Sequence, residues 1–378
     1  MRTDGVGAES ARRLLACFGS APAVFEQSHA ALRQVVSARQ AQALTQEPPE
    51  LAAQLALTQH WLDRSPLHQL WTLGDAAYPQ ALLDLSDPPL MLYAQGRVDL
   101  MQSGQPSVAV VGSRNPTHQG EQTARQMAHA LARAGLCVVS GLALGIDGAA
   151  HWGALDAVAA QEAQETTTGC VTIAVVGTGL DRVYPRQHQD LAQRIAAQGV
   201  LLSEYPLGTP PLAANFSRRN RIIAALGLGT LVVEAALHSG SLITAQLALD
   251  IGREVLAIPG SIHAPQSHGC HALIRQGAKL VEKAQDVLEE LHLPHAGQPQ
   301  AALAFGAAAG AHAAQQPASP HSSAHAALLA HMGFDPVSFD ALLARTGSHT
   351  ATLQADLLRL ELSGHIGRLP GGLFQRSG

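Results

Sequence analysis

The chain has 378 residues, a formal net charge of -5 and 47% hydrophobic residues. This length predicts two or three domains with enough apolar material for buried cores. The negative charge excludes a protein that coats nucleic acid by overall basicity, so any contact with a polyanion has to be local. The sequence shows no secretory signal and no apolar run near the roughly 20 residues that span a bilayer. With four widely spaced cysteines, this pattern predicts a cytoplasmic protein without membrane insertion.

Residues 1–70 are predicted to form a small helical domain. Helices are expected in the segment ESARRLLACF, which Gly19 ends, and over residues 31–44 and 51–62. Short helices joined by glycine turns hold a DNA backbone in helix-hairpin-helix modules. They are also common in modules that contact proteins or simply pack, so both roles stay open for this domain.

Residues 71–292 show the pattern of a parallel α/β sheet. A lead-in over 71–100 contains the expected strand MLYAQG, and a helix with one apolar face is expected over 120–135. Six short apolar runs do not alternate with polar residues, which indicates strands buried on both faces. They are VAVVG (108–112), LCVVSG (136–141), VTIAVVG (171–177), VLLSE (200–204), TLVVE (230–234) and EVLAIPG (254–260).

The end of the chain changes in composition. Residues 157–169 are polar and predict an exposed loop, and residues 293–325 are rich in alanine, glycine, proline, glutamine and serine, which predicts a flexible linker. Residues 326–378 then read as two short amphipathic helices and a hairpin. That order of elements is typical of a winged-helix domain.

The loops after the expected strands form a candidate anion site. In an open parallel sheet these loops meet at one edge, where glycines let backbone amides approach a ligand and helix N-termini point outward. Gly112 and Gly141 have this position, Ser113, Ser239 and Ser241 offer hydroxyl groups, and Arg114 adds a fixed charge. The same glycines are equally typical of strand-to-helix turns without a ligand. The segment GTGLDR lacks the third glycine of a dinucleotide fingerprint, so no cofactor is expected.

Three arginines, Arg218, Arg219 and Arg221, lie beside Phe216 and Asn220 in a stretch that has no carboxylate from position 205 to 233. Close positive charges repel one another, so an anionic ligand is expected to neutralise them. Guanidinium groups bind phosphate oxygens, and an aromatic ring stacks on an unpaired base. The block therefore predicts binding of single-stranded nucleic acid. Pairing of the arginines with distant carboxylates is the alternative.

A catalytic or metal site is not predicted. Nineteen histidines are scattered without metal-ligand spacing, and the acidic residues near the strand ends form no recognised acid/base pair. Asp147 is expected to anchor the GLALGID loop by accepting backbone hydrogen bonds. Glu234 is expected to orient a neighbouring amide or arginine.

The motifs VAVVGSRNPTHQG, VVSGLALGIDGAAH, TIAVVGTGLDRVYP, LLSEYPLG, NFSRRNRIIAAL, VVEAALHSGSLITAQLAL and VLAIPGS occur in this order. Over about residues 70–288 the chain thereby resembles the DprA/Smf family of DNA-processing proteins. The resemblance implies an extended Rossmann fold and a homodimer that binds single-stranded DNA in natural transformation. It also implies loading of the RecA recombinase onto DNA covered by single-strand-binding protein.

The resemblance carries over to particular positions. Ser217 stands where the family usually has proline and Gly227 where it usually has serine, so the basic binding loop is expected to be looser than in the family. His271 stands where the family generally has asparagine, so a polar role is not carried over to that position. The positions implied in DNA binding are Gly112, Ser113, Arg114, Gly141, Phe216, Arg218, Arg219, Asn220, Arg221, Ser239, Gly240 and Ser241.

Two other functions stay open from the sequence. A nucleotide hydrolase of the lysine-decarboxylase-like group would share the GT and later glutamate of GLGTLVVEAALHSGS but would need a PGG segment that is missing here. A transcription regulator would read duplex DNA with its winged helix. The four arginines over 345–376 are matched by four carboxylates over 335–361, which makes that domain a poor independent duplex binder.

Overall fold

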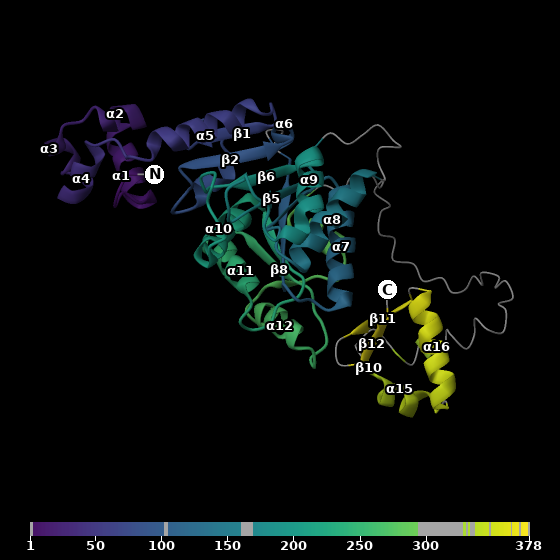
Figure 1. The fold of residues 1–378 in the computed structure, drawn as a ribbon. Coiled ribbons are helices and arrows are strands. Elements are labelled where there is room, and N and C mark those ends of the chain that lie inside the picture. The colour runs from purple at the N-terminus through teal and green to yellow at the C-terminus, as the bar shows by residue number, and fades with distance from the viewer. Residues whose placement is uncertain are drawn as a thin grey trace.

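The computed structural model describes residues 3–101, 105–159 and 169–293, and it describes 328–376 except 330–331, 333–336, 348, 364 and 370–371. Helices at the N-terminus and a small unit at the C-terminus flank a central sheet (Figure 1). The expected linker over 293–325 lies almost wholly outside the described residues, as do residues 160–168 of the expected loop. None of the described helices is both long enough and apolar enough to cross a membrane.

Five helices open the chain, and one prediction for them is wrong. The helix expected over 31–44 is two helices, because Ser37 caps a new one: its hydroxyl accepts the amide of Gln40, and the Gln40 side chain accepts the amide of Ser37. The last helix matches the expected 51–62 closely. The five are α1 (Ala8–Phe18), α2 (Ala21–Phe25), α3 (His29–Leu32), α4 (Ala38–Leu44) and α5 (Leu51–Asp63).

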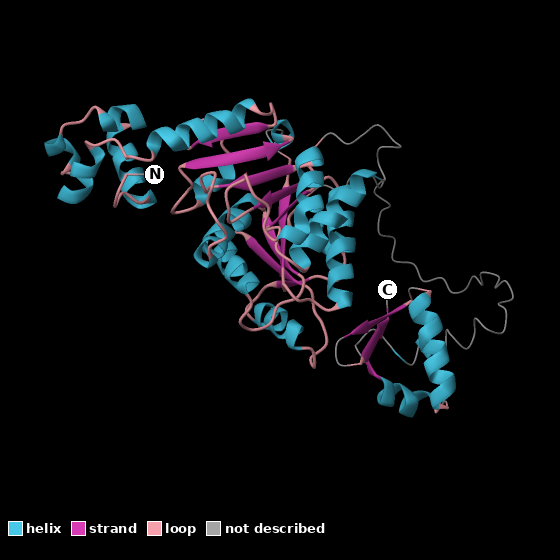
Figure 2. Cartoon of the chain, in the orientation of Figure 1, coloured by secondary structure: helices cyan, strands magenta, loops and turns pink. Residues whose placement is uncertain are grey.

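The central sheet has nine strands in the order β1-β2-β6-β5-β4-β3-β7-β8-β9. The pairs from β6 to β9 are parallel, and β1 and β2 add an antiparallel edge (Figure 2). Each predicted strand is present, although the apolar runs extend into the loops that follow. The bounds are β1 (His68–Thr72), β2 (Met91–Gly96), β3 (Ser107–Val111), β4 (Cys137–Ser140), β5 (Thr172–Val175), β6 (Val200–Ser203), β7 (Gly229–Val232), β8 (Glu254–Ala257) and β9 (Lys279–Leu280).

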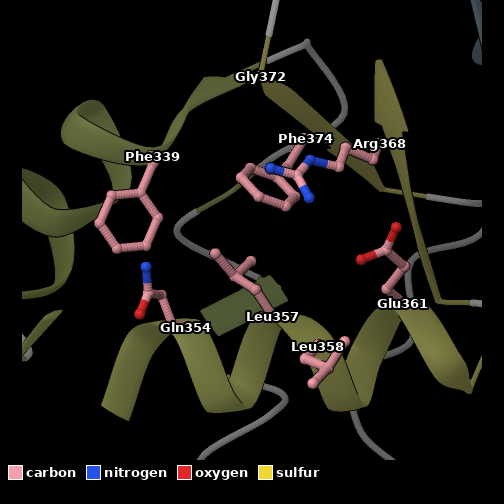
Figure 3. Close-up of a pocket in the computed structure, with 8 residues that line it drawn as sticks. All are labelled: Phe339, Gln354, Leu357, Leu358, Glu361, Arg368, Gly372 and Phe374. Carbon is pink, nitrogen blue, oxygen red and sulfur yellow. The ribbon is translucent and has the colours of Figure 1, made fainter. Parts of the chain in front are cut away.

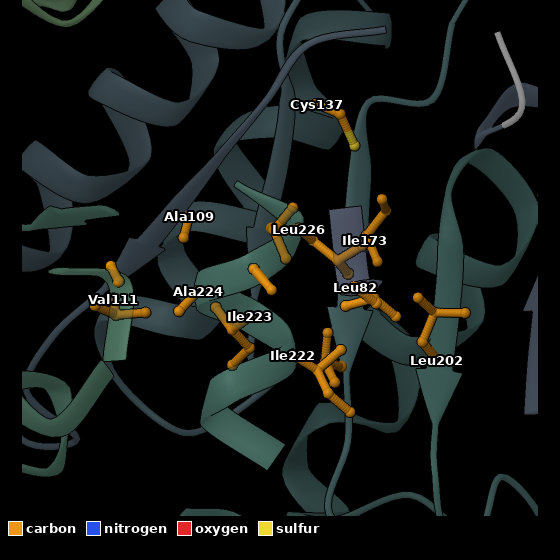
Figure 4. Close-up of a cluster of buried hydrophobic side chains, with 14 of the residues drawn as sticks. Leu82, Ala109, Val111, Cys137, Ile173, Leu202, Ile222, Ile223, Ala224 and Leu226 are labelled. Atoms are coloured by element: carbon orange, nitrogen blue, oxygen red, sulfur yellow. The ribbon is translucent and has the colours of Figure 1, made fainter. Parts of the chain in front are cut away.

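Helices cover both faces of this sheet. Successive side chains of a strand point to opposite faces, so Val108 and Val110 of β3 pack in one apolar cluster and Ala109 and Val111 in another. Figure 4 shows the second cluster, where α10 lies against the strands. On one face lie α7 (His118–Arg133), α8 (Ile146–Ala159), α9 (Gln189–Gln198) and α13 (Ala284–Glu290), and on the other α10 (Ala213–Leu226), α11 (Gly240–Asp250) and α12 (His268–Arg275). The predicted doubly wound, extended Rossmann-like fold is confirmed.

The connections reverse direction between β3 and β7. From β3 the chain adds β4, β5 and β6 on one side, and it then returns to place β7 on the other side of β3. Loops that leave neighbouring strands in opposite directions separate at such a point and open a crevice beyond the carboxyl ends of the strands. The fold therefore places its natural ligand crevice between the loops that follow β3 and β7.

The C-terminal unit has the winged-helix order that the sequence predicts. Helices α15 (Phe339–Thr346) and α16 (Thr350–Leu362) are joined at Gly347, which has the left-handed backbone of a helix terminator. The hairpin of β11 (Ile366–Leu369) and β12 (Leu373–Arg376) follows α16, and β10 (Val337–Ser338), which precedes α15, pairs with β12 to complete a three-stranded sheet. Figure 3 shows α16 and the hairpin around a hollow of about 330 Å³.

Short helical turns complete the described elements. They are η1 (Gln80–Asp84), α6 (Val98–Met101), η2 (Arg186–His188) and η3 (Pro265–Ser267). The division of the chain into domains at residues 70, 292 and 325 stays a prediction.

Candidate nucleic-acid interface

A cavity of about 490 Å³ opens at the switch point of the sheet. It is enclosed by the loops after β3 and β7, by the first turn of α11 and by the side of α10 that carries Phe216, Arg219 and Asn220. Nine of the twelve predicted positions line this cavity: Gly112, Ser113, Arg114, Phe216, Arg219, Asn220, Ser239, Gly240 and Ser241. The structure thus brings together most of the predicted site, while Gly141, Arg218 and Arg221 lie outside the lining.

The loop after β3 holds Arg114 at the rim of the cavity. The amide of Ser113 donates to the carbonyl of Glu234 at 2.7 Å, and the Ser113 hydroxyl accepts the amide of Asn115 at 3.1 Å. These bonds fix the loop backbone against the end of β7. The Arg114 side chain remains exposed, so its charge is available to a ligand.

The N-terminus of α11 forms the opposite wall. Ser239 caps this eleven-residue helix, and its hydroxyl accepts the amide of Ser241 at 3.3 Å. The first amides of a helix lack intrahelical partners and carry the positive end of its dipole. The wall therefore favours an anion such as a phosphate.

The three arginines do not form one basic patch, because they lie on a helix. Residues in a helix are about 100° apart, so neighbouring positions in sequence point in different directions. Arg218 is exposed, whereas Arg219 and Arg221 are buried. The expectation of a basic loop is therefore wrong: the segment is the middle of α10.

Arg221 belongs to a buried ion-pair network. Its Nη2 donates to Oε2 of Glu204 at 2.7 Å, and its Nε donates to Oδ2 of Asp87 at 2.9 Å. Burial lowers the pKa of Arg221, but these two carboxylates outweigh it and leave the pKa raised. The expectation that an anionic ligand neutralises this arginine is wrong, because Asp87 and Glu204 already do so.

Arg219 lies at the floor of the cavity with 3% of its surface exposed. One guanidinium nitrogen donates to the carbonyl of Val175 at the end of β5, whereas Nε has no partner among the described residues. Burial lowers the pKa of Arg219 to about 10, although the Asp147 carboxylate opposes the shift. The group is still a cation at neutral pH. A buried cation whose hydrogen bonds are incomplete adds to the attraction of the cavity for an anion.

Gly141 acts through Arg219 and does not line the cavity. A methyl group at position 141 would overlap the Arg219 guanidinium. The absent side chain therefore makes room for the cation beneath the cavity.

Phe216 supplies the aromatic surface of the cavity. Its ring lies against the backbone of Gly177, and the Arg114 guanidinium carbon lies 5.9 Å from the ring centroid. The preceding residue is held in place as well, because the side-chain amide of Asn215 donates a hydrogen bond to the carbonyl of Gly177 at 3.1 Å. The ring is thus held in place while part of it stays exposed.

Both acidic residues near the cavity have the expected roles. Asp147 accepts the amides of Gly141 and Ala143 at 3.1 and 3.4 Å, and burial raises its pKa. Glu234 accepts the amide and hydroxyl of Thr117 at 2.9 and 2.6 Å. It lines a separate hollow of about 130 Å³, so it does not face the ligand cavity.

The cavity also contains residues that the sequence analysis did not assign to it. Position in the loops after β3 and β7 could have identified Asn115 and His238, since both follow predicted strands. Ser217 and Thr244 depend on the orientation of helices, for which the sequence offers no direct signal. The described residues contain no group of histidine, cysteine or acidic side chains that could hold a metal ion.

Comparison with known proteins gives a consistent result. Residues 69–292 match the family described as DNA recombination-mediator protein A, and residues 312–372 match the DprA winged helix domain. Protein Smf of Escherichia coli (strain K12) is 41% identical over 326 residues, which cover 82% of this chain and 78% of that protein.

Two solved structures are similar over much of the chain. The X-ray structure of DprA from Streptococcus pneumoniae has a TM-score of 0.65 and 36% identity, and the match covers 76% of this chain and 95% of that one. DNA processing protein A from Helicobacter pylori, solved for its single-stranded DNA binding mode, has a TM-score of 0.50 and 31% identity, with 59% and 96% covered. This chain belongs to the DprA/Smf family of DNA-processing proteins.

Proposed function

We propose that this protein is a recombination mediator that binds single-stranded DNA in the cavity at the switch point. The observation that carries the proposal is the composition of this cavity: an exposed Arg114, a buried and incompletely bonded Arg219, a helix N-terminus and a held aromatic ring. Three of these features attract phosphate and the fourth offers a surface to a base. The H. pylori relative, solved for its single-stranded DNA binding mode, supports this ligand.

The ligand is single-stranded because of Phe216. A base that stacks on an aromatic ring has to be unpaired, and such stacking is worth about 1–3 kcal/mol. Any base has a face that can stack, so little sequence preference is expected. The phosphates meet Arg114 and the first amides of α11, whereas Arg218 is exposed on α10 outside the lining of the cavity.

We infer a binding role without catalysis. Hydrolysis of a nucleotide would need an acid or base that faces the ligand, and Glu234, the glutamate shared with the lysine-decarboxylase-like group, has both oxygens bonded to Thr117 in a separate hollow. Asp147 lines the cavity, but two backbone amides occupy its Oδ2. These bonds give both carboxylates a structural role.

Membership of the family supports a wider role. We propose that the protein protects incoming DNA during natural transformation and loads RecA onto it in the presence of single-strand-binding protein. It acts in the cytoplasm as a homodimer. Residues 1–70 and 326–378 form flanking domains around the DNA-binding unit of residues 71–292. A strand-exchange assay tests this role, since RecA should need the protein when the DNA is already covered by single-strand-binding protein.

Binding itself is tested by fluorescence anisotropy with a labelled oligothymidylate over a salt titration. Each phosphate neutralised on a single strand contributes about -0.7 to the log-log slope. Arg114→Met should flatten the slope by about that amount. Phe216→Leu should weaken binding about tenfold at every salt concentration, because stacking is not ionic.

A matched control separates local from general charge effects. Arg125 is an exposed arginine on α7 that pairs with Asp156 at 2.6 Å, away from the cavity. Arg125→Met changes the net charge by the same amount as Arg114→Met and should leave the slope unchanged. Equal slopes for all variants would contradict the proposed site.

A further inference from the structure

A second exposed aromatic ring lies beside Phe216. Tyr184 follows β5 and has 47% of its surface exposed. Its ring centroid lies 5.3 Å from that of Phe216, and the two ring planes are inclined by 40°. Because the planes are not parallel, one base cannot lie flat on both rings. The pair therefore offers surfaces to two different bases.

Tyr184 also adjoins residues that line two different cavities. Phe216, which it contacts, lines the cavity at the switch point. Its neighbour in sequence, Val183, lines a second cavity of about 550 Å³ between α9, the end of α5 and the edge strands. A strand that leaves the first cavity over Phe216 would thus cross Tyr184 to reach the second.

The second cavity has the charge that a phosphodiester needs. Arg64 and Arg182, both exposed, contribute guanidinium groups, and Gln95 and His68 add polar atoms. Among the described residues that line it, Asp181 has the one carboxylate and pairs with Arg182 at 3.2 Å. An exposed ion pair of this kind contributes little energy, so Arg182 can exchange its partner for a phosphate at low cost.

We propose that Tyr184 is a second base-stacking platform, over which single-stranded DNA passes from the switch-point cavity to the cavity that contains Arg64 and Arg182. This inference rests on the proposed function and extends it from one cavity to a continuous path. It makes affinity depend on strand length: a short oligonucleotide fills the first cavity alone, and a longer one also engages Tyr184.

Two substitutions at position 184 isolate the stacking surface. Tyr184→Phe keeps the ring, and the hydroxyl that it removes has no hydrogen-bond partner among the described residues. Tyr184→Leu keeps apolar bulk against Phe216 but removes the aromatic face. For a long oligothymidylate, Tyr184→Leu should weaken binding about tenfold and Tyr184→Phe less than about twofold. For a trinucleotide, measured by competition, both variants should match the unaltered protein.

A fluorescent base analogue then locates the contact. Oligonucleotides that carry one 2-aminopurine at successive positions should show two positions whose fluorescence changes on binding. Phe216→Leu should abolish the response at one position and Tyr184→Leu at the other. Arg64→Met with Arg182→Met should flatten the salt slope by about 1.4 for the long strand only.

The results separate this inference from the proposed function. If Tyr184→Leu binds the long strand like the unaltered protein, or weakens the trinucleotide by the same factor, Tyr184 is not a platform and the inference fails alone. If Phe216→Leu and Arg114→Met bind normally as well, the proposed function fails with it.

Discussion

Arg221 and Arg218 of α10 differ in burial, so the same substitution to methionine should destabilise the protein strongly at position 221 and hardly at all at position 218. Arg221→Met removes a guanidinium that holds Glu204 at 2.7 Å and Asp87 at 2.9 Å. Glu204 is 5% exposed, and its second oxygen has no partner among the described residues, so Arg221 is its principal source of compensation. Arg218→Met removes an exposed guanidinium from the same helix.

The size of the effect follows from burial. Removing one partner of a buried ion pair costs about 3–5 kcal/mol, because it leaves an uncompensated buried charge. Methionine fills much of the volume of arginine, so little of this cost is due to a cavity. An exposed substitution changes stability by less than about 0.5 kcal/mol. Against a total stability of about 5–15 kcal/mol, only Arg221→Met is severe.

Urea unfolding followed by tryptophan fluorescence measures the difference, since Trp71 lies in the core that packs against α10. With a slope of about 3 kcal/mol per molar urea, the midpoint for Arg221→Met should fall by about 1–2 M. The double variant Arg221→Met with Glu204→Gln should recover part of this loss, because it removes the stranded charge. Equal midpoints for Arg221→Met and Arg218→Met, or no recovery in the double variant, would show that Arg221 does not compensate the buried charge of Glu204.

Three further predictions concern groups in the central domain. His151 is buried on α8, where its Nδ1 lies 2.7 Å from Oγ1 of Thr172. Burial lowers the pKa of His151 to about 3, against about 6.5 in an unfolded chain. Between these two pKa values protons bind preferentially to the unfolded state, so the free energy of unfolding falls as the pH falls. In urea titrations, His151→Gln should make the fall in the free energy of unfolding between pH 6.5 and 5 smaller by about 1.5 kcal/mol. Gly141→Ala should displace Arg219 and cost about 1–3 kcal/mol, with weaker oligonucleotide binding by anisotropy; full affinity would contradict the role of Arg219. Glu234→Ala removes the bonds to Thr117 and should lower the free energy of unfolding by about 1–3 kcal/mol in thermal unfolding, without changing oligonucleotide affinity. If the unaltered protein released free base from a nucleotide and Glu234→Ala abolished that release, the hydrolase would be favoured instead.

Much of the fold was predictable because it depends on patterns close in sequence. Strands buried on both faces read as short apolar runs, and the apolar face of α7 follows the helical repeat. The roles of Asp147 and Glu234 were predictable from their positions next to strand ends. The break at Ser37 was visible too, since a serine followed three residues later by glutamine begins a helix.

The burial and the partners of the three arginines could not be predicted from the sequence. Its charges looked uncompensated because the segment 205–233 has no carboxylate, yet Glu204 lies just outside that segment and Asp87 is 134 positions away. Only the fold brings Asp87 to Arg221. Treating the segment as helical would have separated Arg218 from Arg219, but the burial of Arg219 depends on its packing over Gly141.

Photocrosslinking can show which part of the protein contacts single-stranded DNA. An oligonucleotide that contains 4-thiothymidine, bound to the full chain and irradiated, can be mapped onto the protein by mass spectrometry. Crosslinks are expected in the peptides that contain Phe216 and the loop at Ser113 and Arg114. They should be lost when unlabelled single strand is added and retained when duplex is added. Crosslinks confined to the N-terminal helices or to residues 326–378 would contradict the proposed site.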